Sequence, residues 1–411
     1  MLMTVPYMNY TCGPLRRVLE LVLALSCVRF LSKRRRYNTK PYVVGSFQQS
    51  NNTYTCGNSK LLNGVLKDEL GFQGFVQSDW LAEQSGVEAV LSGLDMTMPG
   101  DGKTFLDGKS LLGPHLTQAV LNSTIPLSRL NDMVTRIVAT YFQLGQDKYF
   151  GIQDGKQENS PSFSSWQTTK EGLIHFGSGV GPVGVINRFV DVQEGGRHGK
   201  VARAIGAEGT VLVKNENNIL PLRRKDWKRK KIGIYGEDAG ENKGRNYCPN
   251  RGCNQGTLAS GWGSGAVEFP YLVTPLEALS KAFSDGAILP NEKPEITSIL
   301  SNYDLKAISI SAAEQDLCLV FINSDSGEGF LADLGVKGDR NDLYAQKGGD
   351  NLVSTVAGKC ANTVVIIHSV GAVLVEKWID LENIKGLLYA HLPGQESGNA
   401  LVEISPDILV E

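Results

Sequence analysis

The chain has 411 residues, which is enough for two or three domains with sizeable cores. Its 41 Lys and Arg residues against 43 Asp and Glu residues give a net charge of -2, which argues against nucleic acid or another polyanion as a partner. No run approaches the roughly 18 apolar residues of a membrane span, so neither a nucleic-acid-binding nor a membrane protein is indicated.

Residues 1–40 form an atypical N-terminal segment. Its apolar stretch 18–28 resembles the core of a signal peptide, but it lies between Arg17 and the basic run 33–36, and no convincing cleavage site follows. The segment could be a short core helix, an anchor or sequence foreign to the fold, and we favour the last.

Residues 41–145 alternate between strand and helix patterns, as βαβ units do. We expect strands at 42–47 and 72–76, an amphipathic helix at 58–70, a helix that carries Val87, Val90, Leu91 and Leu94, and a helix at 128–144.

Asp79 follows the short apolar strand that contains Phe75 and Val76, so we place it at the strand's C-terminal tip. In enzymes built of parallel strands, catalytic groups collect at this edge of the sheet. The alternative is that Asp79 only caps the helix that follows, because cap-type residues are common before helices.

Residues 146–200 combine Asp, Gly, Ser and Pro without periodicity and are predicted to be a linker. The basic run 223–231 is short and lies between elements, so we interpret it as a solvated loop rather than a nucleic-acid site.

Residues 201–411 alternate again, with near-continuous apolar strands that indicate a sheet buried on both faces. A parallel or mostly parallel α/β sandwich is therefore expected. The predicted strands are 231–236, 317–323, 363–370 and 384–392, and the predicted helices are 201–214, 275–283 and 352–357.

The seven cysteines are too few for a disulfide scaffold and show no clear zinc-ligand spacing. Cys248 and Cys253 form the only apparent pair, whereas Cys318 is expected to be a buried core thiol. Glycosylation sequons at Asn51 and Asn122 favour the secretory route.

Glu328 lies in the glycine-flanked loop 323–330, on a different unit from Asp79. Two carboxylates facing each other across a cleft suggest glycoside hydrolysis, in which one attacks the sugar and the other donates a proton. Trp80 and Phe330 beside them would offer apolar faces for a sugar ring.

Several motifs along 41–403 together resemble fungal β-glucosidases of glycoside hydrolase family 3. They are GFQGFVQSDW (71–80), SGLDMTMPGDG (92–102), GEDAG (236–240), NSDSGEGF (323–330), GDRNDL (338–343), HSVGAVLVEKW (368–378) and LPGQESGNAL (392–401). The resemblance implies that Asp79 is the nucleophile and Glu328 the acid/base of a retaining mechanism without metal or organic cofactor. The implied substrate is a terminal, non-reducing β-linked glucose, as in cellobiose and cello-oligosaccharides, and the implied location is outside the cell.

By the same resemblance, Trp80 is the aromatic platform beside the cleaved bond, and Ser264 in the WGSG motif contacts the sugar. Phe47 stands where the family has a tyrosine, and Gly45 stands where it has the cysteine that pairs with the equivalent of Cys56. Cys56 is therefore expected to remain a thiol.

A complete (β/α)₈ barrel needs about 250 residues, whereas roughly 100 recognisable residues precede the linker. The resemblance thus implies an incomplete barrel in 41–145, the linker 146–200 and an α/β sandwich in 201–411, with truncation at both ends. A catalytically impaired, carbohydrate-binding fragment and a related β-xylosidase remain as alternatives, and the sequence does not indicate an oligomeric state.

Overall fold

The computed structural model describes residues 42–45, 47–98, 100, 110–144, 152–153, 156–157, 171–173, 183–185, 197–241, 255–261, 269–284, 292–327, 332–333 and 336–403. The chain divides into two compact units, the first within 1–161 and 173–184 and the second within 162–172 and 185–411. The N-terminal segment 1–40 and most of the linker 146–200 lie outside the described residues. In the described part of the chain, no helix combines the length and apolar character of a membrane span.

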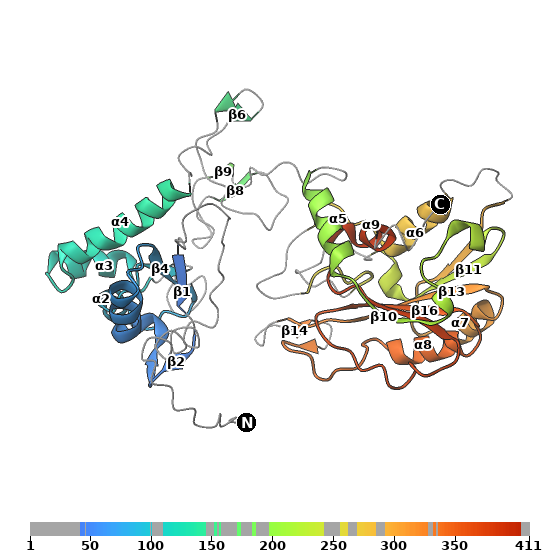
Figure 1. The fold of residues 1–411 in the computed structure, drawn as a ribbon. Helices are drawn as coiled ribbons and strands as arrows, with labels where there is room; N and C mark the ends of the chain where they lie inside the picture. The colour runs from blue at the N-terminus through green and yellow to red at the C-terminus, as the bar shows by residue number, and fades with distance from the viewer. Residues whose placement is uncertain are drawn as a thin grey trace. The chain divides into compact units, whose positions relative to one another are not determined.

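The first unit contains a three-stranded parallel sheet with β4 (Phe75–Trp80) at its centre (Figure 1). β1 (Tyr42–Gly45) pairs along one edge of β4, and β5 (Met96–Met98) pairs along the other. The strands alternate with helices, as the sequence predicts. These helices are η2 (Lys60–Glu69), α2 (Val87–Leu91), α3 (Gly113–Leu121) and α4 (Leu127–Gln143), and a hairpin of β2 (Gln49–Ser50) and β3 (Thr53–Tyr54) with the turn η1 (Thr55–Gly57) connects β1 to η2.

The core of this unit lies between β1, η2 and β4, because the inward side chains of the strands meet the apolar face of the helix. Its fully buried members include Leu62 and Val76. A second cluster, around Val90, Ile125 and Met133, packs α2 against α3 and α4. The apolar side chains whose periodicity predicts η2 and α4 therefore pack into these two clusters.

Two expectations about β4 are corrected. The strand runs from Phe75 to Trp80 rather than over 72–76, because its pairing with β1 and β5 continues to Ser78 and Trp80. Asp79 thus lies inside β4, one residue before its end. It is also not a helix cap, since α2 begins at Val87 behind Gly86. The helix α3 and the strand β5 were not predicted.

A buried carboxylate, that of Asp95, connects the strands to the helices of the first unit. Its Oδ1 lies 2.8 Å from Lys67 Nζ and 2.7 Å from a terminal nitrogen of Arg129, and its Oδ2 accepts the Val76 backbone N–H at 2.8 Å. Burial lowers the pKa of the Lys67 ammonium, while the Asp95 charge acts in the opposite direction. Asp132, which is 41% exposed, extends the network from Arg129 to Arg136.

The second unit is built on a six-stranded sheet in the order β10-β17-β16-β13-β11-β12. All pairs are parallel except that of β10 with β17, which confirms the predicted mostly parallel sheet. The strands are β10 (Val211–Asn215), β11 (Lys231–Tyr235), β12 (Glu295–Ile299), β13 (Leu317–Ser324), β16 (Thr363–Ser369) and β17 (Ile384–Tyr389). Every residue of β13 and β16 is buried, as expected for strands covered on both faces.

Helices cover both faces of this sheet (Figure 1). α5 (Arg197–Gly209), α6 (Pro275–Ser284) and α9 (Ser397–Glu403) lie on one side, and α7 (Leu305–Ala312) and α8 (Gly349–Ala357) on the other. Two separate apolar clusters fill the layers: one contains Phe283 of α6 with Phe321, and the other contains Leu352 of α8 with Val320. Short paired strands lie outside the two main sheets: β6 (Ile152–Gln153) with β7 (Lys156–Gln157), β8 (Glu171–Leu173) with β9 (Val183–Val185), and β14 (Ala332–Asp333) with β15 (Val336–Lys337).

The predicted helix 201–214 is corrected. α5 ends at Gly209, and β10 begins at Val211 as the edge strand of the sheet. The stretch VLVK is compatible with either conformation, but its antiparallel pairing with β17 places it in the sheet. β12, α7 and α9 were not predicted.

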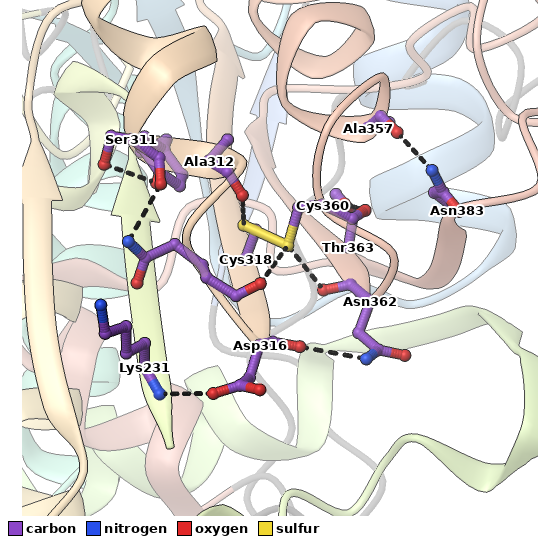
Figure 2. The surroundings of a disulfide bond; sticks show 12 residues. Lys231, Ser311, Ala312, Asp316, Cys318, Ala357, Cys360, Asn362, Thr363 and Asn383 are labelled. Carbon is purple, nitrogen blue, oxygen red and sulfur yellow. Dashed lines mark hydrogen bonds between the residues drawn. A yellow bond between two sulfur atoms is a disulfide. The ribbon is translucent and has the colours of Figure 1, made fainter. Parts of the chain in front are cut away.

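Cys318 is also corrected. It is buried in β13 as expected, but it forms a disulfide with Cys360, which lies just before β16 (Figure 2). The two cysteines are 42 residues apart, so no local spacing indicates the pair. Adjacent strands β13 and β16 bring them together, with Cys318 opposite Thr363.

We expect Asp95→Asn to lower the free energy of unfolding by about 3–5 kcal/mol, because two cations would keep their burial and lose their shared carboxylate. Urea denaturation followed by circular dichroism measures the change. Asp132→Asn is the matched control: its carboxylate is 41% exposed against 0% for Asp95, so its removal should cost about 1 kcal/mol or less. Equal costs for both variants would contradict the importance of the buried carboxylate.

Candidate active site

Asp79 is half-buried at the carboxyl end of the central strand of the first unit. Its Oδ1 accepts the Trp80 backbone N–H at 2.7 Å, and its carbonyl oxygen accepts the Ala82 N–H at 3.1 Å. Leu81 has a φ of 62° and turns the chain immediately after the strand. The carboxylate is therefore held at the sheet edge, where it remains partly accessible.

The hydroxyl of Ser78 fixes the strand beside this carboxylate. Ser78 is buried, and its Oγ accepts the Met98 backbone N–H at 2.8 Å, which ties β4 to the end of β5. The Leu81 N–H donates to the Met98 carbonyl at 2.9 Å and extends the connection beyond Asp79. Asp79 is thus flanked on both sides by residues that are bonded to the neighbouring strand.

Two aromatic side chains are exposed at the same edge of the sheet. Trp80 is 43% exposed, and Phe47, 52% exposed, follows the end of β1 by two residues. Gly45, the last residue of β1, lies opposite Ser78 in the parallel register. Exposed aromatic faces beside a carboxylate suit a sugar ring, which stacks its apolar face on an aromatic ring.

The Cys56 thiol is buried close to the Asp79 backbone. Burial, followed by the charges of Glu83 and Asp79, raises its pKa to about 12, although a hydrogen bond from the Asp79 backbone acts in the opposite direction. Since the thiolate is the reactive form of cysteine, the raised pKa disfavours a nucleophilic role for Cys56.

Glu83 was not identified from the sequence, although it lies four residues after Asp79. Its carboxylate is buried, and Oε1 accepts the N–H groups of Ser85 and Gly86 at 2.7 and 2.5 Å. These bonds shape the turn into α2. Its Oε2 has no hydrogen-bond partner among the described residues.

None of the site residues assigned to the second unit belongs to the described part of the chain. Glu328, Phe330 and Ser264 lie outside the described residues, so their roles stay predictions. The chain on the N-terminal side of Glu328 is described as far as Gly327, whose N–H donates to the Gly338 carbonyl at 2.8 Å.

A buried polar cluster at the end of the second sheet was missed by the sequence interpretation. Asp238 Oδ2 lies 2.6 Å from His368 Nδ1, and His368 Nε2 lies 3.3 Å from Ser397 Oγ. The order of carboxylate, imidazole and hydroxyl is that of serine hydrolases, but all three residues are sealed from solvent. Asp238 Oδ1 also accepts the Leu258 N–H and the Asn323 side-chain amide, so the cluster joins the loops that leave the sheet.

No group of three or more His, Cys, Asp or Glu side chains in the described ranges is arranged to hold a metal ion. The arrangement in the first unit instead offers one partly accessible carboxylate beside aromatic surfaces.

The chain matches a protein-family model and is similar to several known proteins. Residues 210–404 match the model of the glycosyl hydrolase family 3 C-terminal domain. The chain is 55% identical over 369 residues to the probable beta-glucosidase E of Aspergillus oryzae, and 47% identical over 363 residues to beta-glucosidase 1 of Aspergillus aculeatus.

Among solved structures, the Chaetomium thermophilum beta-glucosidase superposes with a TM-score of 0.74 at 47% identity and covers 89% of this chain. Each match includes only part of the relative: 34% of the Aspergillus oryzae protein, 40% of the Aspergillus aculeatus protein and 41% of the Chaetomium thermophilum structure. The chain therefore spans about a third to two fifths of the length of these relatives.

We expect Gly45→Cys to form a disulfide with Cys56. A Cβ at position 45 would lie 2.8 Å from Cys56 Sγ, close to the about 3 Å that separates a Cβ from the partner sulfur in a disulfide. Under oxidising conditions, non-reducing peptide mass spectrometry should detect the linked peptides with the loss of two hydrogen atoms.

Gly45→Ser is the matched control, because it adds a side chain of similar shape that cannot form the bond. The added atoms would crowd Cys56 Sγ and should lower the unfolding free energy by about 1–3 kcal/mol. Unlinked peptides in the oxidised Gly45→Cys variant would show that the two positions are not neighbours.

Proposed function

We propose that this homologue of the fungal glycoside hydrolase family 3 β-glucosidases is itself a retaining β-glucosidase. Its substrates would be terminal, non-reducing β-D-glucosyl residues in cellobiose, cello-oligosaccharides and aryl glucosides. The observation that carries the proposal is the position of Asp79 at the carboxyl end of the central parallel strand, within a chain 55% identical to a probable beta-glucosidase over 88% of its length.

In the proposed mechanism, Asp79 attacks the anomeric carbon and forms a glycosyl-enzyme intermediate. Glu328 donates a proton to the leaving oxygen and then removes one from the water that releases the sugar. The half-buried position of Asp79, with one oxygen bonded to the Trp80 N–H, supports the first role, because a nucleophile must be held in place. The role of Glu328 rests on its place in the SGEGF motif.

For the sugar we propose contacts from Trp80, Phe47, Phe330 and Ser264. The exposure of Trp80 and Phe47 beside the end of β4 supports the first two. Phe47 lacks the hydroxyl of the family's tyrosine, so it would contribute a ring face only.

For the fold of the first unit we propose part of a (β/α)₈ barrel. Its β1-η2-β4-α2-β5 order, with consecutive strands pairing in parallel, supports the interpretation that 41–145 is part of a (β/α)₈ barrel. The solvent-facing apolar side chains of α4 support it further, since a barrel helix packs against neighbours on both sides. They are Leu127, Val134, Val138, Tyr141 and Phe142.

We also propose that the protein is secreted. The disulfide between Cys318 and Cys360 supports this location, because disulfides persist in oxidising compartments and are rare in the cytosol.

A second candidate function is a carbohydrate-binding fragment without catalysis. The exposed aromatic pair Trp80 and Phe47 favours it, because two aromatic faces could hold a sugar without cleaving it. Calorimetric binding of cello-oligosaccharides without turnover would identify this function, and faster hydrolysis of an aryl β-xyloside than of the glucoside would identify a β-xylosidase.

We expect Asp79→Asn to lower kcat/KM for an aryl β-glucoside at least about a thousandfold, because the amide cannot form the covalent intermediate. Asp68→Asn, a change of the same kind at an exposed position of η2, should leave the rate within about twofold. A wild-type rate no higher than that of Asp79→Asn would overturn the proposed function.

We expect Glu328→Ala to depend on the leaving group. Hydrolysis of phenyl β-glucoside, which needs protonation, should fall by about 10² to 10⁴, and that of dinitrophenyl β-glucoside should fall much less. Added azide should yield β-glucosyl azide, as product analysis can verify. Equal losses for both substrates without azide product would refute the acid/base role.

A further inference from the structure

The strand that precedes Glu328 ends in a buried, unusual connection. β13 stays in register with β16 as far as Ser324 beside Ser369. The next residue, Asp325, is fully buried although it lies beyond the ladder. A buried backbone needs hydrogen-bond partners, so the peptide groups of Asp325 must be satisfied from elsewhere.

Gln346 supplies those partners through its side chain. Its Oε1 accepts the Asp325 N–H at 2.9 Å, and its Nε2 donates to the Asp325 carbonyl at 2.8 Å. Its own backbone N–H donates to the Asn323 carbonyl at 2.9 Å. The primary amide thus reproduces the exchange of two hydrogen bonds that a paired residue makes in an antiparallel ladder, and it takes the place of a neighbouring strand.

The two residues after Asp325 are also bonded. The Gly327 N–H and the Ser326 hydroxyl both donate to the Gly338 carbonyl, at 2.8 and 3.3 Å. On the other side, a Cβ added to Gly261 would lie 2.9 Å from the Ser326 carbonyl oxygen, so the loop 255–261 closely approaches this backbone. Residues 325–327 are therefore held on two sides. The hydrogen bonds from the Gln346 side chain hold the first of these residues, Asp325.

Gly327 is bonded covalently to Glu328, and proton transfer requires the donor within hydrogen-bond reach of the leaving oxygen. We propose that Gln346 is a positioning residue for Glu328, which acts by fixing the backbone of 325–327. This inference rests on the acid/base role of Glu328 in the proposed function. In this proposal Gln346 acts only through the backbone that it holds, so it is a positioning residue and not a catalytic one.

The variant that tests the proposal is Gln346→Met, which keeps the length of the side chain and removes both hydrogen bonds. Gln315→Met is the matched control, because the Gln315 amide donates to the Ser311 carbonyl on the opposite end of the strands. Gln346→Glu is the conservative variant: it keeps an acceptor for the Asp325 N–H and loses the donor to the carbonyl.

The first measurement is amide hydrogen exchange in the full chain, which does not depend on activity. We expect the Gly327 amide to exchange at least about tenfold faster in Gln346→Met than in wild type, with an intermediate rate in Gln346→Glu. Gln315→Met should leave it unchanged. An unchanged rate at Gly327 in Gln346→Met would overturn the proposal whatever the activity.

The second measurement is kcat/KM, which reports the glycosylation step, for two leaving groups. In Gln346→Met we expect about a tenfold loss with phenyl β-glucoside and less than about a twofold loss with dinitrophenyl β-glucoside, because only the former needs the proton. Equal losses would mean a general structural role and refute positioning. A wild-type chain without turnover would refute the proposed function and the catalytic part of this inference, while the exchange rates would still decide whether Gln346 holds the segment.

Discussion

The buried carboxylate of Asp95 is the constraint on which the first unit depends. It faces two cations, Lys67 from η2 and Arg129 from α4, and it accepts a backbone N–H from β4. Taking three charges out of water is costly, and the cost is offset only if all three stay together. The helices η2 and α4 are thereby fixed to β4, the strand that carries Asp79.

The second unit uses a buried carboxylate in a comparable way. Asp238 accepts from Leu258, Asn323 and His368, which belong to a loop and two neighbouring strands. Asn323 lies five residues before Glu328 and also accepts the Gln346 N–H through its carbonyl. In both units, then, hydrogen bonds to a shielded acidic group order the chain segments near a proposed catalytic residue.

The elements that could be predicted are those whose sequence pattern agrees with their surroundings. β13 and β16 read as apolar strands because they are buried on both faces. β12 (EITSI) is an edge strand with little apolar signal, and β10 was mistaken for helix because only its pairing with β17 decides its conformation. The position of Asp79 near the carboxyl end of a parallel strand could be predicted from the strand and helix pattern, while its catalytic role stays a prediction. The contact of Gln346 with Asp325 could not be predicted. The two residues are 21 positions apart, and nothing in the sequence indicates that the Gln346 amide takes the place of a neighbouring strand.

The disulfide of the second unit gives its chain the topology of a closed ring. Cys318 and Cys360 are 42 positions apart in the sequence, and the ring includes the loop of Glu328, the segment of Gln346 and the whole of α8. A protease that cuts one peptide bond inside this ring releases no fragment, because the two pieces remain covalently joined through sulfur. In an environment rich in proteases, the loop proposed to deliver the proton could therefore be nicked without being lost from the molecule.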